Sequence, residues 1–109
     1  MKAFGIQQAL LGKTPTSQTS ISFAYPGTAP AVSANGSSDG IVWAVQNSNP
    51  AALHAFAAGN LATELYNSNQ AANGRDQFGA GNKFIAPTVA DGKVFVATTA
   101  SVGVFGLLP

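Results

Sequence analysis

Few side chains in this 109-residue sequence could take part in acid–base or metal chemistry: it has four acidic residues, one histidine and no cysteine. Asp39 and Asp91 fall in predicted hairpin turns, which leaves Glu64, Asp76 and the single His54. A catalytic zinc needs several converging ligands, and neither a His-Glu-x-x-His spacing nor a Gly-x-Ser-x-Gly elbow is present. We therefore expect His54 to be a hydrogen-bonded or exposed strand residue, and we predict no catalytic residue, no metal and no organic cofactor.

The candidate ligand-binding residues are Tyr66, Arg75, Asp76 and Phe78, which lie in or beside a long predicted loop. Adjacent opposite charges such as Arg75 and Asp76 usually form a local ion pair, and the alternative is an anchor for a carboxylate or a sugar. The aromatic side chains, together with Tyr25, could stack on sugar rings. Asparagines recur in the predicted turns. Their tolerance of left-handed backbone conformations is enough to explain this, and the alternative is an amide-rich rim that binds glycans.

Composition excludes several classes of function. Charged residues make up 8% of the chain and the formal net charge is +1, so strong non-specific binding to nucleic acid or anionic membranes is not expected. No apolar run is long enough for a transmembrane helix, and Gln7 and Gln8 interrupt the N-terminal apolar stretch that a signal peptide would need. The length allows one domain, and 46% hydrophobic residues suffice for a core.

Alternation of apolar and polar residues predicts strands over residues 19–25, 40–45, 92–97 and 102–107. Asn-Gly and Asp-Gly pairs precede the second and third of these, and such pairs favour hairpin turns with positive φ. Residues 49–65 favour strand–turn–strand over a helix, because Gly59 and Asn60 interrupt the helical period; a single helical turn near 61–64 is the alternative. Residues 67–82 are rich in Asn, Gln, Ala and Gly and indicate a surface loop.

Two segments of the chain are copies of one unit. The offset between the copies falls from 57 residues at Pro30 and Pro87 to 49 at Phe56 and Phe105, so the length differences are confined to turns. A repeat of roughly 40–60 residues built from short strands is typical of propeller blades. We predict an all-β fold of antiparallel, four-stranded, propeller-blade-like repeats, about two blades in an incomplete propeller. The expected division is a poorly defined segment 1–16, a first unit 17–66, a loop 67–85 and a shorter second unit 86–109.

The motifs Pro-Thr-Val-Ala-Asp-Gly-Lys-Val-Phe-Val-Ala at 87–97 and Leu-His-Ala-Phe-Ala-Ala-Gly-Asn-Leu at 53–61 resemble the repeats of pyrroloquinoline-quinone-type β-propellers. Residues 33–44, 64–70 and 104–108 are similar to the C-terminal end of large secreted bacterial proteins of that superfamily, and the resemblance covers about residues 17–109. It implies a secreted or periplasmic location. Dehydrogenases of the family hold the quinone and Ca²⁺ with acidic and amide ligands, an aspartate base and a stacking tryptophan. Here Trp43 occupies a strand position at which the repeat accepts any bulky aromatic side chain. About two blades cannot close a ring that usually contains four to eight blades.

The expected function is a non-catalytic β-propeller-like scaffold or binding module that forms a homo-oligomer or completes a larger propeller. The alternatives are a fragment or subunit of a quinoprotein-type oxidoreductase and a small glycan-binding module. Residues 101–108 are the densest apolar stretch, so we expect this end to be buried in a sheet with Phe105 as its anchor, in the place that Phe56 holds in the first copy.

Overall fold

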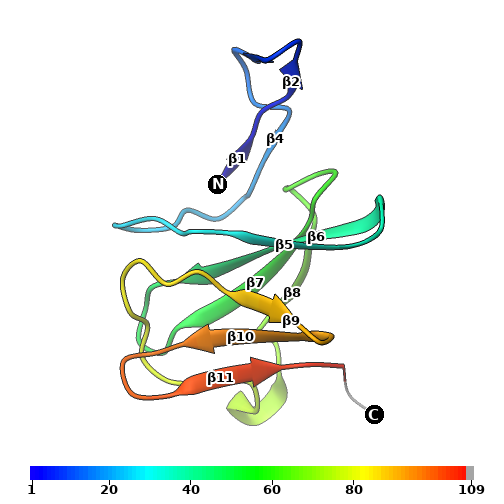
Figure 1. Cartoon of the computed structure of the whole chain (residues 1–109). Helices are drawn as coiled ribbons and strands as arrows, with labels where there is room; N and C mark the ends of the chain where they lie inside the picture. The colour runs from blue at the N-terminus through cyan, green and yellow to red at the C-terminus, as the bar shows by residue number, and fades with distance from the viewer. Residues whose placement is uncertain (108–109) are drawn as a thin grey trace.

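The computed structural model describes residues 1–107 and confirms the predicted all-β fold (Figure 1). The described residues form several small antiparallel sheets, none of them closed, and no α-helix. The predicted loop contains one 3-10 turn, η1 (Ala72–Gly74).

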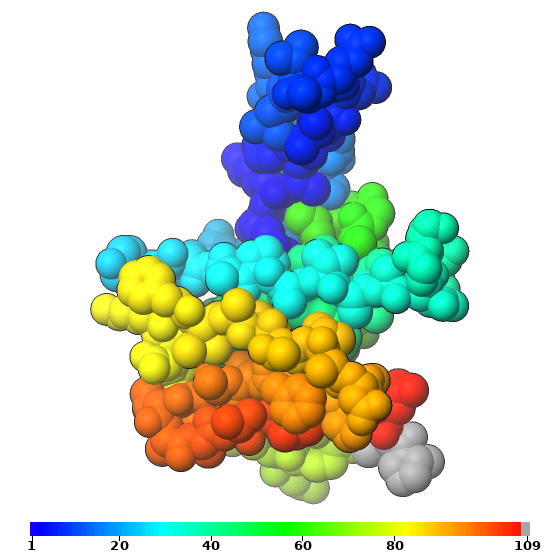
Figure 2. Space-filling view, in the orientation of Figure 1, coloured from blue at the N-terminus to red at the C-terminus, as the bar shows by residue number. Residues whose placement is uncertain are grey.

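The N-terminal residues form a narrow finger that stands above the rest of the molecule (Figures 1 and 2). At its base β1 (Lys2–Ala3) pairs with β4 (Ser17–Gln18), and at its tip β2 (Ile6–Gln7) pairs with β3 (Leu10–Leu11). The apolar side chains of Ile6, Leu10 and Leu11 are all exposed at the tip.

The first repeat unit is a four-stranded sheet in the order β5-β6-β7-β8. Its strands are β5 (Ala31–Asn35), β6 (Ser38–Gln46), β7 (Ala52–Ala57) and β8 (Glu64–Asn67). The predicted strand–turn–strand over residues 49–65 is therefore confirmed, without a helical turn. The β5–β6 hairpin turns at Gly36 and Ser37, one residue later than the Asn-Gly pair predicts, because a bulge that includes Asp39 at a φ of 54° shifts the register.

The second repeat unit has three strands, in the order β11-β10-β9, and not the four that the repeat predicts. They are β9 (Thr88–Ala90), β10 (Lys93–Ala97) and β11 (Val102–Phe105), and only two described residues follow β11. Asp91 and Gly92 form the β9–β10 turn with φ values of 49° and 66°, which confirms the Asp-Gly hairpin.

The two units share the same strand registers, which supports the repeat found in the sequence. Each central strand, β6 or β10, pairs equivalent residues on both sides. The equivalent sets are Ala31, Trp43 and Ala55 with Thr88, Phe95 and Val104, and Val32, Val42 and Phe56 with Val89, Val94 and Phe105.

Because side chains alternate along a strand, each sheet has two faces that can be matched between the units. We call face A the one that carries Trp43, Val45 and Leu53 in the first sheet, and face B the one that carries Val42, Ala44 and Phe56. The equivalent positions of the second sheet place Phe95, Ala97, Val102 and Val104 on its face A, and Val94, Val96 and Phe105 on its face B.

The larger core forms where face A of the first sheet packs against face B of the second. Val45, Leu53, Val94 and Val96 are buried there, with Trp43 packed at the margin. The two sheets approach each other at their first strands, β5 and β9. The two sheets thus stack head to tail, so that face A points in the same direction in both of them.

Face B of the first sheet is covered by the N-terminal region. Ala44 and Phe56 are buried there under Ile21, Phe23 and the base of the finger. The predicted strand over residues 19–25 is wrong, although the alternation is reflected in the half-buried Ile21 and Phe23. Beyond Thr19, whose backbone N donates to Met1 O over 3.0 Å, the segment crosses the face of a sheet and has no strand partner among the described residues.

The C-terminal residues do form a strand of a sheet, and Phe105 packs against the main core, but the strand is less buried than the sequence predicts. Within residues 1–107, β11 is an edge strand that pairs only with β10, and Val102 and Val104 are 58% and 55% exposed. Phe105 is half-buried, whereas Phe56 is only 1% exposed. The difference arises because β7 has neighbours on both sides and β11 on one. Leu108 lies outside the described residues.

Candidate functional site

The structure brings Tyr66, Arg75 and Asp76 together at the start of the long loop. Tyr66 on β8 donates its hydroxyl hydrogen bond to Asp76 Oδ2 over 2.7 Å. Arg75 donates from Nε to Oδ1 over 2.7 Å and from Nη2 to Oδ2 over 3.0 Å. Arg75 and Asp76 thus form the local ion pair that adjacent opposite charges usually form. The hydrogen bond from Tyr66 ties the loop to the first sheet.

The hydrogen bonds from Arg75 and Tyr66 lower the pKa of the Asp76 carboxyl to about 2. Burial, followed by the hydrogen bond to Asp76, raises the pKa of the Tyr66 phenol. Both Asp76 oxygens and the Tyr66 hydroxyl are engaged within the cluster, so these groups hold the loop against β8, while the Arg75 side chain is 58% exposed.

Phe78, the fourth candidate, lies on the other side of the loop against the second sheet. Its ring makes an edge contact with Phe105, at 5.1 Å between ring centroids. A Cβ added to Gly103 would lie 2.8 Å from Phe78 Cβ, so only a glycine on β11 admits this approach. Tyr66 and Phe78 are both half-buried and do not form the exposed stacking surface that the sequence suggested, whereas Tyr25 is 77% exposed.

A groove of about 370 Å³ runs between this loop and the edge strand β11. Arg75, Asp76 and Phe78 line one side, and residues 101–105 line the other. In the described part of the chain, the backbone of β11 pairs with β10 alone. An unpaired strand edge with a groove beside it is suited to accept an extended segment of another chain or domain.

The exposed face A of the second sheet adjoins this groove. Phe95 and Ala97 are half-buried and Val102 and Val104 are exposed, all on the same side of the sheet. The sequence predicted the strands that carry these residues, and two blade-like units are expected to leave an outer face and an edge strand uncovered. Comparison of the strand registers adds which face this is, since the equivalent face of the first unit is covered by the second sheet.

His54 is a buried, hydrogen-bonded strand residue, as expected from the sequence. Its Nδ1 lies 2.6 Å from Glu64 Oε1 and its Nε2 lies 3.2 Å from Gln46 Oε1, with Phe23 and Phe56 against the ring. Both ring nitrogens therefore have partners inside the first sheet.

Among residues 1–107, no group of three or more His, Asp or Glu side chains lies close enough to hold a metal ion. In the same range, no helix is long and apolar enough to cross a membrane.

Comparison of the chain with protein-family models, curated proteins and solved structures finds no match. The resemblance to quinoprotein-type propellers therefore stays a prediction that rests on the motifs of the sequence.

Proposed function

We propose that the protein is a non-catalytic scaffold of blade-like β-repeats that packs a further β-sheet against its second unit. The observation that carries this proposal is the open face A of the second sheet. The equivalent face of the first sheet is covered by a neighbouring sheet, whereas Val102 and Val104 are more than half exposed. Exposed, contiguous apolar side chains on a sheet mark an interaction surface.

The edge of the second sheet supports the same proposal. In the first unit β8 pairs with β7, and in the second unit the equivalent edge of β11 has no partner among the described residues. A fourth strand beside β11 would complete the unit, and the groove next to the Arg75–Asp76 pair gives it room. The two sheets meet at their first strands, β5 and β9, which supports a blade-like arrangement of the units around a common axis.

The state of the titratable groups favours binding over catalysis. His54 is bound to Glu64, and Asp76 is bound to Arg75, so these groups are occupied with each other. The other two carboxylates, on Asp39 and Asp91, lie at hairpin positions with positive φ. We infer that the partner is a sheet of the same kind, from a second copy of this chain or from a further blade-like unit.

The test is the solution mass of the protein and of two matched valine variants. Val104→Glu places a charge on the open face A, where this valine is 55% exposed, and Val32→Glu places one on a valine of β5 that is 64% exposed. We expect light scattering to give a mass above the 11.0 kDa of one chain for the wild type and for Val32→Glu, and a monomer for Val104→Glu. Circular dichroism would show that both variants keep their strands. A wild type that is monomeric over a wide concentration range, or dissociation by both variants alike, would contradict self-association through this face.

A further inference from the structure

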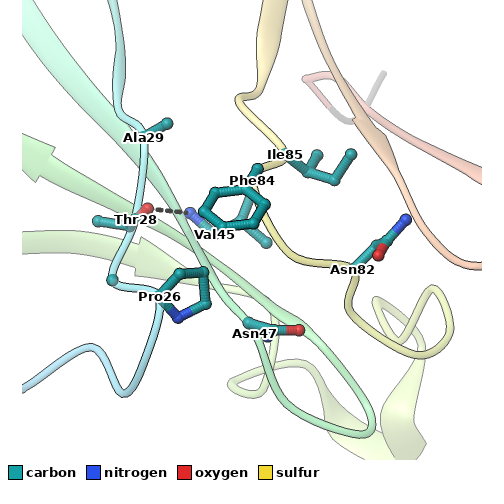
Figure 3. A pocket seen from close by; sticks show the side chains of 9 residues that line it. Pro26, Thr28, Ala29, Val45, Asn47, Asn82, Phe84 and Ile85 are labelled. Carbon is teal, nitrogen blue, oxygen red and sulfur yellow. Dashed lines mark hydrogen bonds between the residues drawn. The ribbon is translucent and has the colours of Figure 1, made fainter.

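A small hollow lies away from the groove, between residues 26–29 and residues 82–85, with a volume of about 110 Å³ (Figure 3). We call it the Phe84 pocket; it is lined mainly by Pro26, Thr28, Val45, Asn47, Asn82 and Phe84. We propose that the Phe84 pocket binds one pyranose ring of a neutral saccharide, with the ring stacked on Phe84 and its hydroxyl groups bonded to the surrounding amides.

Phe84 occupies a position that folding alone does not favour. Its side chain is 77% exposed, and its backbone has a φ of 62°, a left-handed conformation that bulky residues rarely adopt. The next residue, Ile85, packs into the main core, so the chain turns one apolar side chain inward and the other outward. Strained backbone with an exposed aromatic ring is typical of a binding position.

Polar groups with free hydrogen-bonding capacity surround the apolar floor made by Val45 and Pro26. The amide of the half-buried Asn47 makes no hydrogen bond to any residue from 1 to 107. Thr28 Oγ1 accepts a hydrogen bond from Val45 N over 3.2 Å, which leaves its own proton to donate. Asn82 Oδ1 accepts from the backbone N of Lys83 over 2.9 Å, which leaves its amino group.

The walls of the pocket are held in place by contacts between the two segments and their neighbours. Lys83 Nζ lies 5.2 Å from the centre of the Tyr25 ring, which joins the two sides. The backbone N of Gly81 donates to Ser48 O over 2.8 Å, beside Asn47. A binding site that is formed before the ligand arrives loses less entropy when the ligand binds.

The chemistry of the lining selects a neutral ring that carries hydroxyl groups. Among the described residues no acidic or basic side chain lines the pocket, and the nearby Lys83 ammonium lies over the Tyr25 ring, so the lining itself favours an uncharged ligand. Its volume is well below the roughly 300–1,000 Å³ of sites for larger ligands, which limits it to one ring. A pyranose has C–H bonds that suit the negative face of an aromatic ring, and hydroxyl groups at its rim that can both donate and accept.

The test is an NMR titration of the protein with the methyl glycosides of glucose, galactose and mannose, and with adenosine as a flat, neutral ring of another class. We expect at least one glycoside to shift the side-chain amide signals of Asn47 and Asn82 in a saturable way. The dissociation constant should lie in the millimolar range, as for a small ligand that is only partly enclosed.

Phe84→Gly is the decisive variant, because glycine adopts a positive φ readily and the fold should be kept. We expect it to weaken glycoside binding at least about tenfold, since the stacking surface is lost. Phe4→Ala removes another exposed phenylalanine, on the finger, and should leave binding unchanged. The proposal is overturned if no glycoside shifts the two amide signals, if Phe84→Gly binds as well as the wild type, or if adenosine alone binds there.

Discussion

Phe56 and Phe105 occupy equivalent positions in the two units, and replacing each by alanine measures how differently the units bury them. Phe56 is 1% exposed between the first sheet and the N-terminal region, so Phe56→Ala should lower the free energy of unfolding by about 3–5 kcal/mol. Phe105 is half-buried on an edge strand and keeps part of its contact with water in the folded state. Its truncation should therefore cost roughly half as much, about 2 kcal/mol.

Urea unfolding of the wild type and both variants would measure these losses. A small domain has about 5–15 kcal/mol of total stability, so the shift for Phe56→Ala is a large fraction of it and easily resolved. The slope of the transition should stay constant, and the mass in solution should be followed so that dissociation is not mistaken for unfolding. A loss for Phe105→Ala that equals or exceeds the loss for Phe56→Ala would refute the assignment of β11 as a partly exposed edge strand.

Three further measurements test other contacts. Gly103→Ala should lower the free energy of unfolding by about 1–3 kcal/mol, because the new Cβ would meet Phe78 Cβ at 2.8 Å. Gly59→Ala, where a Cβ would meet nothing within 4 Å, is the control and should change stability by less than about 0.5 kcal/mol; equal effects would contradict the contact. Ser68→Ala leaves a buried backbone N–H without its acceptor and should cost about 1–3 kcal/mol in the same urea assay, whereas a neutral result would show that water replaces the hydroxyl. Because the pKa of Asp76 is lowered to about 2, its stabilising effect should be complete above the ordinary aspartate pKa and be lost as the pH falls from about 4 to about 2; an Asp76→Asn variant with the same pH profile as the wild type would contradict this.

The repeat made much of the fold predictable from the sequence. Gly and aromatic residues at matching positions indicated two equivalent β units, and the register of β6 with its neighbours is reproduced in β10. Hairpin turns at Gly36 and Gly92 followed from local backbone chemistry, which depends on few residues. Local rules of this kind do not require knowledge of distant parts of the chain.

The features that the sequence did not predict depend on distant contacts. The segment with Ile21 and Phe23 alternates like a strand, yet whether it pairs at an edge or crosses a face depends on where the first sheet lies. The Arg75–Asp76 pair was visible as adjacent charges, but the participation of Tyr66 needed the position of β8 beside the loop. Phe84 gave no signal at all, because nothing in the sequence marks a phenylalanine with a positive φ.

The head-to-tail stacking of the units has a consequence for how copies of the protein can assemble. An interface between unlike faces is heterologous, and repeated without closure it would give an open-ended stack. The N-terminal region caps one end, because Ile21 and Phe23 cover face B of the first sheet. With that end capped, association through the sheet faces brings the open A faces of two identical chains together about a two-fold axis, and these faces then leave no face for a third chain. Self-association should stop at a dimer of twice 11.0 kDa, and continued growth would require a unit that lacks this cap.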